Sequence, residues 1–352
     1  MANLSKIEWC DHTLNAISGC LNDCPYCYAR NMVRRFSGDT RYNVSLTDQY
    51  RSFPGPGIYK DRTLYELDEP FKEETGGTVA YPFGFEVTFQ RHRLKLLDRL
   101  KGGSNIFIGA MSDTFGPWVP ERWITEIFEQ CRLHERNNYM FLTKFPERYM
   151  ELLPILPLGE HFWYGTTITA NRDLGRIDSL PGGANRFLSI EPLLEQLFIP
   201  AEDLKGIGWI IIGAETGRRN EKVVPKFEWV KPLVLAADTL GIPVFMKDSM
   251  IKIVGEENMR RDKPGIMETR MMSAKREEKE YADCAQCGRR LRRNTMVTLQ
   301  ARVGKHEKNN PSPTKTICAM CRSCYEKWCK YHKLEGYVKE LYGEDISNEE
   351  EP

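Results

Sequence analysis

Three cysteines lie close together near the amino terminus, at Cys20, Cys24 and Cys27, with gaps of three and two residues. Three thiolates on one short loop can hold three irons of a cubic iron–sulfur cluster, whereas a fourth would close the cluster off. The remaining iron stays open to a substrate or cofactor, as the open position does in catalytic metal sites. The spacing therefore favours a catalytic [4Fe-4S] cluster.

Half of a zinc site, or a disulfide with a spare thiol, are the alternatives for this loop. A zinc knuckle usually has a second one as its partner, but the next cysteine in the chain is Cys131. Disulfides belong mainly to exported proteins, and Met1 to Lys6 contain no apolar signal core. The 11 cysteines therefore predict a reducing, cytoplasmic location with metal-binding roles.

The composition is that of an ordinary soluble protein, with 41% hydrophobic and 28% charged residues. The longest apolar runs, such as residues 209–214, are too short to cross a bilayer, so we expect no membrane association.

Strand-like and helical segments alternate after the cysteine loop. Strands are expected at 85–89, 106–110, 140–143, 162–166, 186–190, 209–213 and 243–246, with a further short strand before Gly19. Helices are expected at 91–100, 121–133, 147–153 and 227–239. This alternation predicts an α/β fold, a partial or full (β/α) barrel of the TIM type with a small cysteine-rich C-terminal module.

Shifts in composition predict the domain boundaries. The barrel is expected over residues 1–265, interrupted at 37–82 by an irregular insertion that walls or covers the site or is a plain surface loop. A charged linker at 266–283, a zinc-ribbon-like module at 284–335 and an acidic tail at 336–352 follow.

Polar residues follow the predicted strands at their carboxyl ends, where parallel barrels carry their active sites. They are Ser112, Asp113, Thr143, Lys144, Thr166, Thr167, Glu191, Glu215, Lys247 and Asp248. Acids, hydroxyls and a lysine can bind a zwitterionic cofactor through charge-assisted hydrogen bonds. Some of these residues could instead cap helices. Cys10, shortly before the loop, is either a hydrogen-atom donor or a buried small hydrophobe.

Tyr26 completes the pattern C-x3-C-x-aromatic-C, which resembles the signature of the radical S-adenosylmethionine (radical SAM) superfamily. The resemblance implies a barrel in which the open iron binds SAM and a cluster electron cleaves it to a 5′-deoxyadenosyl radical. It also implies an electron donor such as flavodoxin or ferredoxin. The cofactor contacts that we expect are Tyr26, Ser112, Asp113, Lys144, Thr167 and Glu191.

Further blocks narrow the resemblance. Residues 112–121 and 142–144 resemble the spore-photoproduct-lyase-like branch, which places Lys144 near the SAM carboxylate. The blocks that resemble a phage-associated family of radical-SAM-like proteins are 6–9, 19–20, 27–29, 83–86, 189–194 and 213–217. The chain departs from many relatives in lacking a clear Gly-Gly-Glu element, and we expect Ser112 and Asp113 to replace it.

The C-terminal cysteines form a second predicted metal site. Cys284, Cys287, Cys321 and Cys324 read as the two knuckles of a zinc ribbon, with Cys318 as an alternative ligand. A second iron–sulfur cluster is the competing interpretation.

This segment is also basic. Between Cys284 and Lys330 there are eleven Lys and Arg residues against two Glu, with Tyr325 and Trp328 among them. Such a segment suits a nucleic-acid backbone, and a protein-docking or merely solvated surface is the alternative. We therefore expect a nucleic acid or nucleotide as substrate. A peptide or small metabolite, or a non-catalytic nucleic-acid-binding protein, remain the competing hypotheses.

Overall fold

The structure is a computed structural model that describes residues 4–100, 102–217, 219–268 and, beyond these, 281–284, 290–292, 296–302, 314–321 and 324. The chain divides into two compact units, Met1–Met272 and Ser273–Pro352. Within the described residues, no helix is long and apolar enough to cross a membrane.

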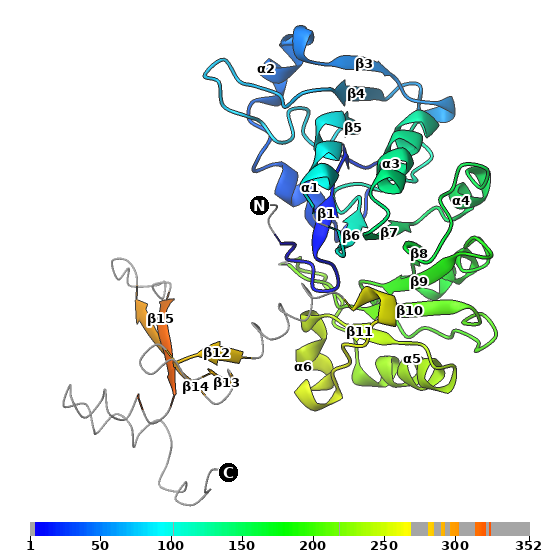
Figure 1. The fold of residues 1–352 in the computed structure, drawn as a ribbon, viewed down its shortest axis with the longest axis vertical. Helices are drawn as coiled ribbons and strands as arrows, with labels where there is room; N and C mark the ends of the chain where they lie inside the picture. Colours follow the sequence, from blue (N-terminus) through cyan, green and yellow to red (C-terminus); the bar gives the residue numbers. More distant parts are fainter. Residues whose placement is uncertain are drawn as a thin grey trace, which may run out of the picture. The chain divides into compact units, whose positions relative to one another are not determined.

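A seven-stranded parallel sheet forms the centre of the first unit (Figure 1). Its strands pair in chain order: β1 (His12–Leu14), β6 (Asn105–Ile108), β7 (Asn138–Thr143), β8 (Phe162–Thr167), β9 (Asn185–Ile190), β10 (Ile207–Ile212) and β11 (Val244–Met246). β1 and β11 are the two edges and do not pair with each other. The α/β fold is confirmed, and of the two barrel forms that we expected, this sheet is the partial one.

Crossover segments connect the strands, as parallel pairing requires, and all but the one between β9 and β10 contain helices. The α-helices are α1 (Tyr28–Val33), α2 (Thr40–Ser45), α3 (Glu121–Leu133), α4 (Glu147–Glu151), α5 (Phe227–Thr239) and α6 (Ile251–Val254). The 3₁₀ segments are η1 (Thr47–Gln49), η2 (Gly57–Tyr59), η3 (Arg91–Arg99), η4 (Asn171–Arg176), η5 (Asp248–Met250), η6 (Glu256–Asn258) and η7 (Gly265–Met267). In Figure 1, α3, α4 and α5 lie along the same side of the sheet.

Side chains alternate between two apolar layers along each strand, because successive residues point to opposite faces. In β10, Ile210 and Ile212 belong to the large cluster that includes residues of α3 and α5. Trp209 and Ile211, between and beside them, belong to a second cluster on the other face. Trp9 from the amino-terminal segment fills this second layer, with its ring 4.7 Å from that of Phe107 and 6.1 Å from that of Trp209.

A second, four-stranded sheet lies before β6 in the chain. It has the order β2 (Ile17–Ser18), β5 (Thr88–Gln90), β4 (Thr63–Leu67) and β3 (Arg51–Pro54). Two expectations were wrong here. The strand predicted at 85–89 belongs to this sheet as β5, and the insertion at 37–82 is not irregular because it contributes α2, β3 and β4. Buried Glu66 of β4 accepts hydrogen bonds from Arg51, Arg122 and Trp123, which joins the insertion to α3.

The predicted barrel boundary at residue 265 is too early. Ile266 and Met267 pack into the second apolar layer. Asn105 and Asn138, at the starts of β6 and β7, donate side-chain hydrogen bonds to the carbonyls of Met267 and Ile266 at 2.6 and 2.8 Å. These amides hold the 266–267 segment against the sheet.

The second unit contains two antiparallel strand pairs, β12 (Tyr281–Asp283) with β13 (Arg290–Arg292) and β14 (Met296–Arg302) with β15 (Thr314–Cys321). Cys284 is buried and Cys324 partly buried, and Cys318 and Cys321 lie in β15. Cys287 and the acidic tail lie outside the described residues, so the four-ligand zinc site stays a prediction.

Candidate active site at the carboxyl ends of the strands

The cysteine loop begins at Gly19, a position that only glycine suits. Its φ is +83°, and a Cβ there would lie 2.3 Å from the Glu86 carbonyl oxygen. The Gly19 N–H donates to the Met111 carbonyl at 3.1 Å, and Gly19 forms a parallel bridge with Ser112. The start of the loop is thereby fixed to the segment that follows β6.

All three cysteines are partly exposed and line one cavity of about 740 Å³. The loop turns between Cys24 and Cys27, where the Cys27 N–H donates to the Cys24 carbonyl at 3.1 Å. Burial, followed by the nearby charge of Asp113, raises the pKa of Cys20 to about 12. This thiol is therefore protonated at neutral pH until a metal takes the place of the proton.

The three thiols of the loop are not gathered around one point. Within the part of the chain that the structure describes, no three His, Cys, Asp or Glu side chains are gathered to hold one metal ion. A mononuclear zinc site needs its sulfurs about 2.3 Å from one point. A cubic cluster instead gives each thiolate its own iron at a separate corner.

The cavity brings together most of the predicted site residues from the carboxyl ends of successive strands, whereas Thr166 and Asp248 do not line it. Its lining includes Tyr26, Ser112, Asp113, Thr143, Lys144, Thr167, Glu191, Glu215 and Lys247, together with Cys20, Cys24 and Cys27. A volume near 740 Å³ lies within the range of about 300–1,000 Å³ that is usual for small-molecule sites. Cys10 does not line it: this residue is fully buried in the second apolar layer, with its thiol 3.4 Å from the Ser5 hydroxyl.

Asp113 positions the site. One carboxylate oxygen accepts from the Thr143 hydroxyl at 2.6 Å and the Phe115 N–H at 3.3 Å. The other accepts from the Lys144 N–H at 3.0 Å and from the Asn22 amide at 3.1 Å. Four donors use the full acceptor capacity of a carboxylate. Asp113 thus ties the cysteine loop to the end of β7, and Asn22 is a site residue that the sequence analysis missed.

Lys144 lies where four titratable groups meet, the Asp113 carboxylate and the side chains of Tyr26, Cys20 and Cys24. Burial acts to lower the pKa of its ammonium, but the charges of Tyr26, Cys24, Asp113 and Cys20 outweigh it and hold that pKa above the ordinary value. Burial raises the pKa of Tyr26, whose phenol hydrogen-bonds Thr169 next to buried Asp173. Lys144 is therefore a permanent cation beside the cysteine loop, suited to an anionic group of a ligand.

Two polar atoms of the cavity lining are buried without a hydrogen-bond partner among the described residues. They are the Ser112 hydroxyl oxygen and the Trp9 indole nitrogen. Buried polar atoms are normally satisfied by protein, water or ligand. A ligand in the cavity would supply the missing partner.

The carboxyl ends of β9, β10 and β11 form a charged part of the lining. Lys247 donates to the Glu191 carboxylate. The pair needs Gly213 at the end of β10, since a Cβ there would lie 3.0 Å from the Glu191 side chain and 3.2 Å from that of Lys247. Glu215 is buried and paired with Arg219 through two hydrogen bonds of 2.8 Å.

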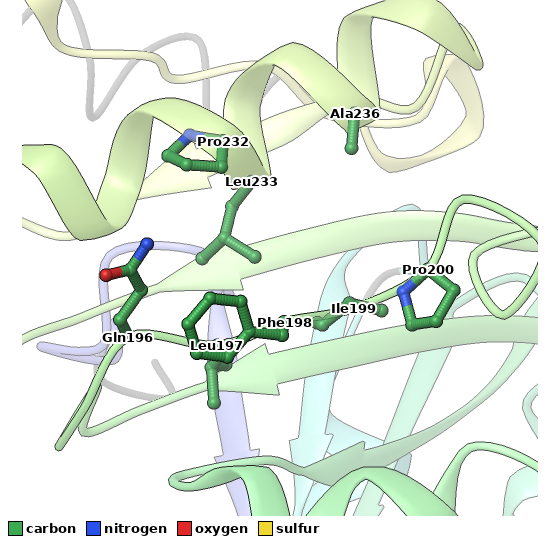
Figure 2. Close-up of a pocket in the computed structure, with 8 residues that line it drawn as sticks. All are labelled: Gln196, Leu197, Phe198, Ile199, Pro200, Pro232, Leu233 and Ala236. Atoms are coloured by element: carbon green, nitrogen blue, oxygen red, sulfur yellow. The ribbon is translucent and has the colours of Figure 1, made fainter.

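A second hollow of about 380 Å³ lies between residues 196–200 and α5 (Figure 2). Figure 2 shows its lining as Gln196, Leu197, Phe198, Ile199, Pro200, Pro232, Leu233 and Ala236. Gln196 is the single polar side chain among them, so this hollow offers no acid, base, nucleophile or metal ligand. The cysteine-lined cavity is the candidate active site.

A parallel α/β half-barrel with a cysteine-lined cavity at its strand ends is the class of protein that this geometry defines. A family model described as "Protein of unknown function (DUF5131)" matches residues 4–282, and the chain belongs to this family. No curated protein matches the chain.

Solved structures of spore photoproduct lyase are similar to the chain at low identity. A complex with dinucleoside spore photoproduct has a TM-score of 0.37 and 9% identity, covering 97% of this chain and 77% of the other. A variant with bound AdoMet and the same dinucleoside has a TM-score of 0.35 and 10% identity, covering 94% and 73%.

Proposed function

We propose that the protein is a radical SAM enzyme, with Cys20, Cys24 and Cys27 as ligands of a [4Fe-4S] cluster. The supporting observation is that these three thiols share one cavity with the acids, hydroxyls and lysines of six strand ends. A cluster with one open iron, with SAM bound to it, supplies a one-electron reduction that starts radical chemistry on a substrate.

The residues around the cysteines have binding roles in this proposal. The Lys144 ammonium attracts the carboxylate of the cofactor, and the Ser112 hydroxyl finds there the partner that it lacks. Tyr26 walls the site beside Lys144, and Thr167 adds a hydroxyl from the end of β8. Glu191, held by Lys247, is an acceptor for a cofactor amino or hydroxyl group. Asp113 is a positioning residue.

We propose a nucleic acid as the substrate class. The support is that the segment between Cys284 and Lys330 contains eleven basic residues and two acidic ones. An electron donor of the flavodoxin or ferredoxin kind is the partner that the reduction requires.

Anaerobic reconstitution tests the proposal. About four irons per chain should bind at the amino-terminal site, and the reduced protein should cleave SAM to 5′-deoxyadenosine. Replacing Cys20, Cys24 and Cys27 together with Ala should abolish both, whereas Cys131→Ala, a buried cysteine of α3, should retain both. Normal SAM cleavage by the triple variant would overturn the assignment.

Elemental analysis of the reconstituted protein distinguishes the zinc ribbon from the second iron–sulfur cluster in the C-terminal module. One zinc per chain beside about four irons supports the ribbon, and about eight irons without zinc supports a second cluster.

A further inference from the structure

An exposed apolar stripe runs along α1, directly after the third cysteine. Tyr28 and Met32 are four residues apart in α1, which places them on one face of the helix, and Phe36 follows in the turn after the helix ends. They are 50%, 41% and 55% exposed. Ala29 and Val33, on the adjacent face, are buried and anchor the helix. The contacts that hold α1 in place therefore do not involve the stripe, whose exposed apolar surface is free to bind another molecule.

The stripe leads into the candidate active site. Tyr28 and Met32 line the cavity, next to the aromatic rings of Tyr81 and Phe85. The Phe36 carbonyl accepts from the Tyr81 N–H at 3.3 Å, so the outer end of the stripe lies beside the same rings. Arg93 lies 5.1 Å from the Tyr81 ring centre and Arg30 lies 5.1 Å from that of Phe85. Tyr28, Met32, Tyr81 and Phe85 thus give the cavity wall aromatic and apolar groups, and exposed Phe36 follows Met32 along the chain outside the cavity.

Positive charge accompanies the stripe. Arg34 and Arg35 are exposed, and neither forms an ion pair within the described ranges. Arg30 is paired with Asp23 at 2.9 Å. Asp39, the nearest acid beyond Phe36 in the chain, is occupied in capping α2. Arg34 and Arg35 are thus available to anionic partners.

We propose that Tyr28, Met32, Arg34, Arg35 and Phe36, together the α1 surface, bind single-stranded nucleic acid and direct one base into the cavity. The proposal rests on the proposed function and deepens it by naming where the substrate strand lies. Aromatic platforms beside arginines are the features that hold single strands, because bases stack on the rings and phosphates contact the guanidinium groups.

The shape of the site favours a strand over an acidic protein partner. A docked protein would use the exposed arginines and apolar groups but could not reach the aromatic groups of the cavity wall. A cavity of about 740 Å³ is of the size of small-molecule sites and excludes a folded domain.

Equilibrium binding of a fluorescent oligothymidylate of about 15 nucleotides to the full chain tests the proposal. Phe36→Ala removes one stacking ring, and the Kd should rise about 5- to 50-fold. Arg34→Gln with Arg35→Gln removes two phosphate contacts, so the slope of log K against log salt should become shallower by about 1.4. Phe198→Ala and Arg172→Gln are the matched controls, since Phe198 is 69% exposed on another surface and Arg172 is an exposed arginine of η4; both should bind like the parent.

Stacking and charge are separated with heparin, a polyanion without bases. Phe36→Ala should leave heparin binding unchanged. A 4-thiothymidine probe should cross-link to the peptide that contains residues 28–36. If Phe36→Ala binds oligothymidylate like the parent, the proposal is overturned and the surface binds no strand. If the double arginine variant binds oligothymidylate like the parent but loses binding to flavodoxin, the surface binds a protein partner instead.

Thermal unfolding shows whether the variants remain folded. We expect Phe36→Ala to remain folded, because Phe36 is exposed. Absence of SAM cleavage in the parent protein would contradict the proposed function alone, because strand binding is measured independently of it.

Discussion

At the scale of single residues, Asp113 shows what a strand-end pattern can and cannot predict. The sequence places a carboxylate at the end of β6, and the structure confirms that it lines the cavity. Its four donors come from Asn22, Phe115, Thr143 and Lys144. Pairing of β6 with β7 brings Thr143 and Lys144 to it, and the bridge between Gly19 and Ser112 brings the cysteine loop. Such saturation depends on tertiary contacts, which is why the sequence suggested a cofactor ligand where the structure has a positioning group.

Asp113→Asn should therefore weaken the attachment of the cysteine loop. An amide can accept at only one of its two terminal atoms, so either orientation leaves two donors without an acceptor. We expect the free energy of unfolding to fall by about 2 kcal/mol and reconstituted iron to decrease. Urea unfolding and iron analysis measure these effects. Asp178→Asn, an exposed aspartate, is the control, and equal behaviour of the two variants would contradict the positioning role.

At the scale of elements, periodicity predicted helices better than sheet membership. Helix α3 begins at Glu121 and ends at Leu133, and α5 spans Phe227–Thr239, both as expected, because an amphipathic period of 3.6 is a local signal. The strand expected at 85–89 overlaps β5 (Thr88–Gln90) only at residues 88 and 89, and it was assigned to the wrong sheet. Alternation of apolar and polar residues shows that a strand has a buried face, but it does not show which strand lies beside it. The neighbour of β5 is β4, which belongs to the insertion.

The 3₁₀ segment η3 holds a histidine that should make stability depend on pH. Burial, and then the charge of Arg93, lower the pKa of His92 to about 4, below the value of about 6.5 in unfolded chains. Between these values the unfolded state binds the proton and the folded state does not, so stability is lost as the pH falls.

His92→Gln should remove this part of the pH dependence. From pH 7.5 to pH 5, we expect the variant to lose about 1 kcal/mol less stability than the parent, after allowing for partial exposure. Urea unfolding at the two pH values measures the difference. Parallel losses in both proteins would show that His92 titrates normally.

At the scale of the whole first unit, an open sheet has to protect two edges and one apolar face. The amino-terminal segment does so from one side: Trp9 enters the second apolar layer, and Glu8 accepts from the Asp248 N–H and from Arg261, both at 2.8 Å. Glu8 thus connects the segment before β1 with the segment after β11, although these two edges share no strand pairing. The open barrel is joined through a side chain instead of a backbone ladder.

Glu8→Ala and Glu8→Gln should lower the stability of the protein by different amounts. Alanine leaves the Asp248 N–H without this acceptor, and we expect a loss of about 1–3 kcal/mol with faster amide exchange in β1 and β11. Glutamine keeps a carbonyl for that N–H. Because burial raises the pKa of Glu8, its charge is costly in place, and losing the charge should change stability by less than losing the acceptor. Urea unfolding and hydrogen exchange measure both, with Lys6→Ala, an exposed neighbour, as control. Equal stability of the Glu8→Ala and Lys6→Ala variants would show that the sheet edges are held together by Trp9 and its apolar contacts alone.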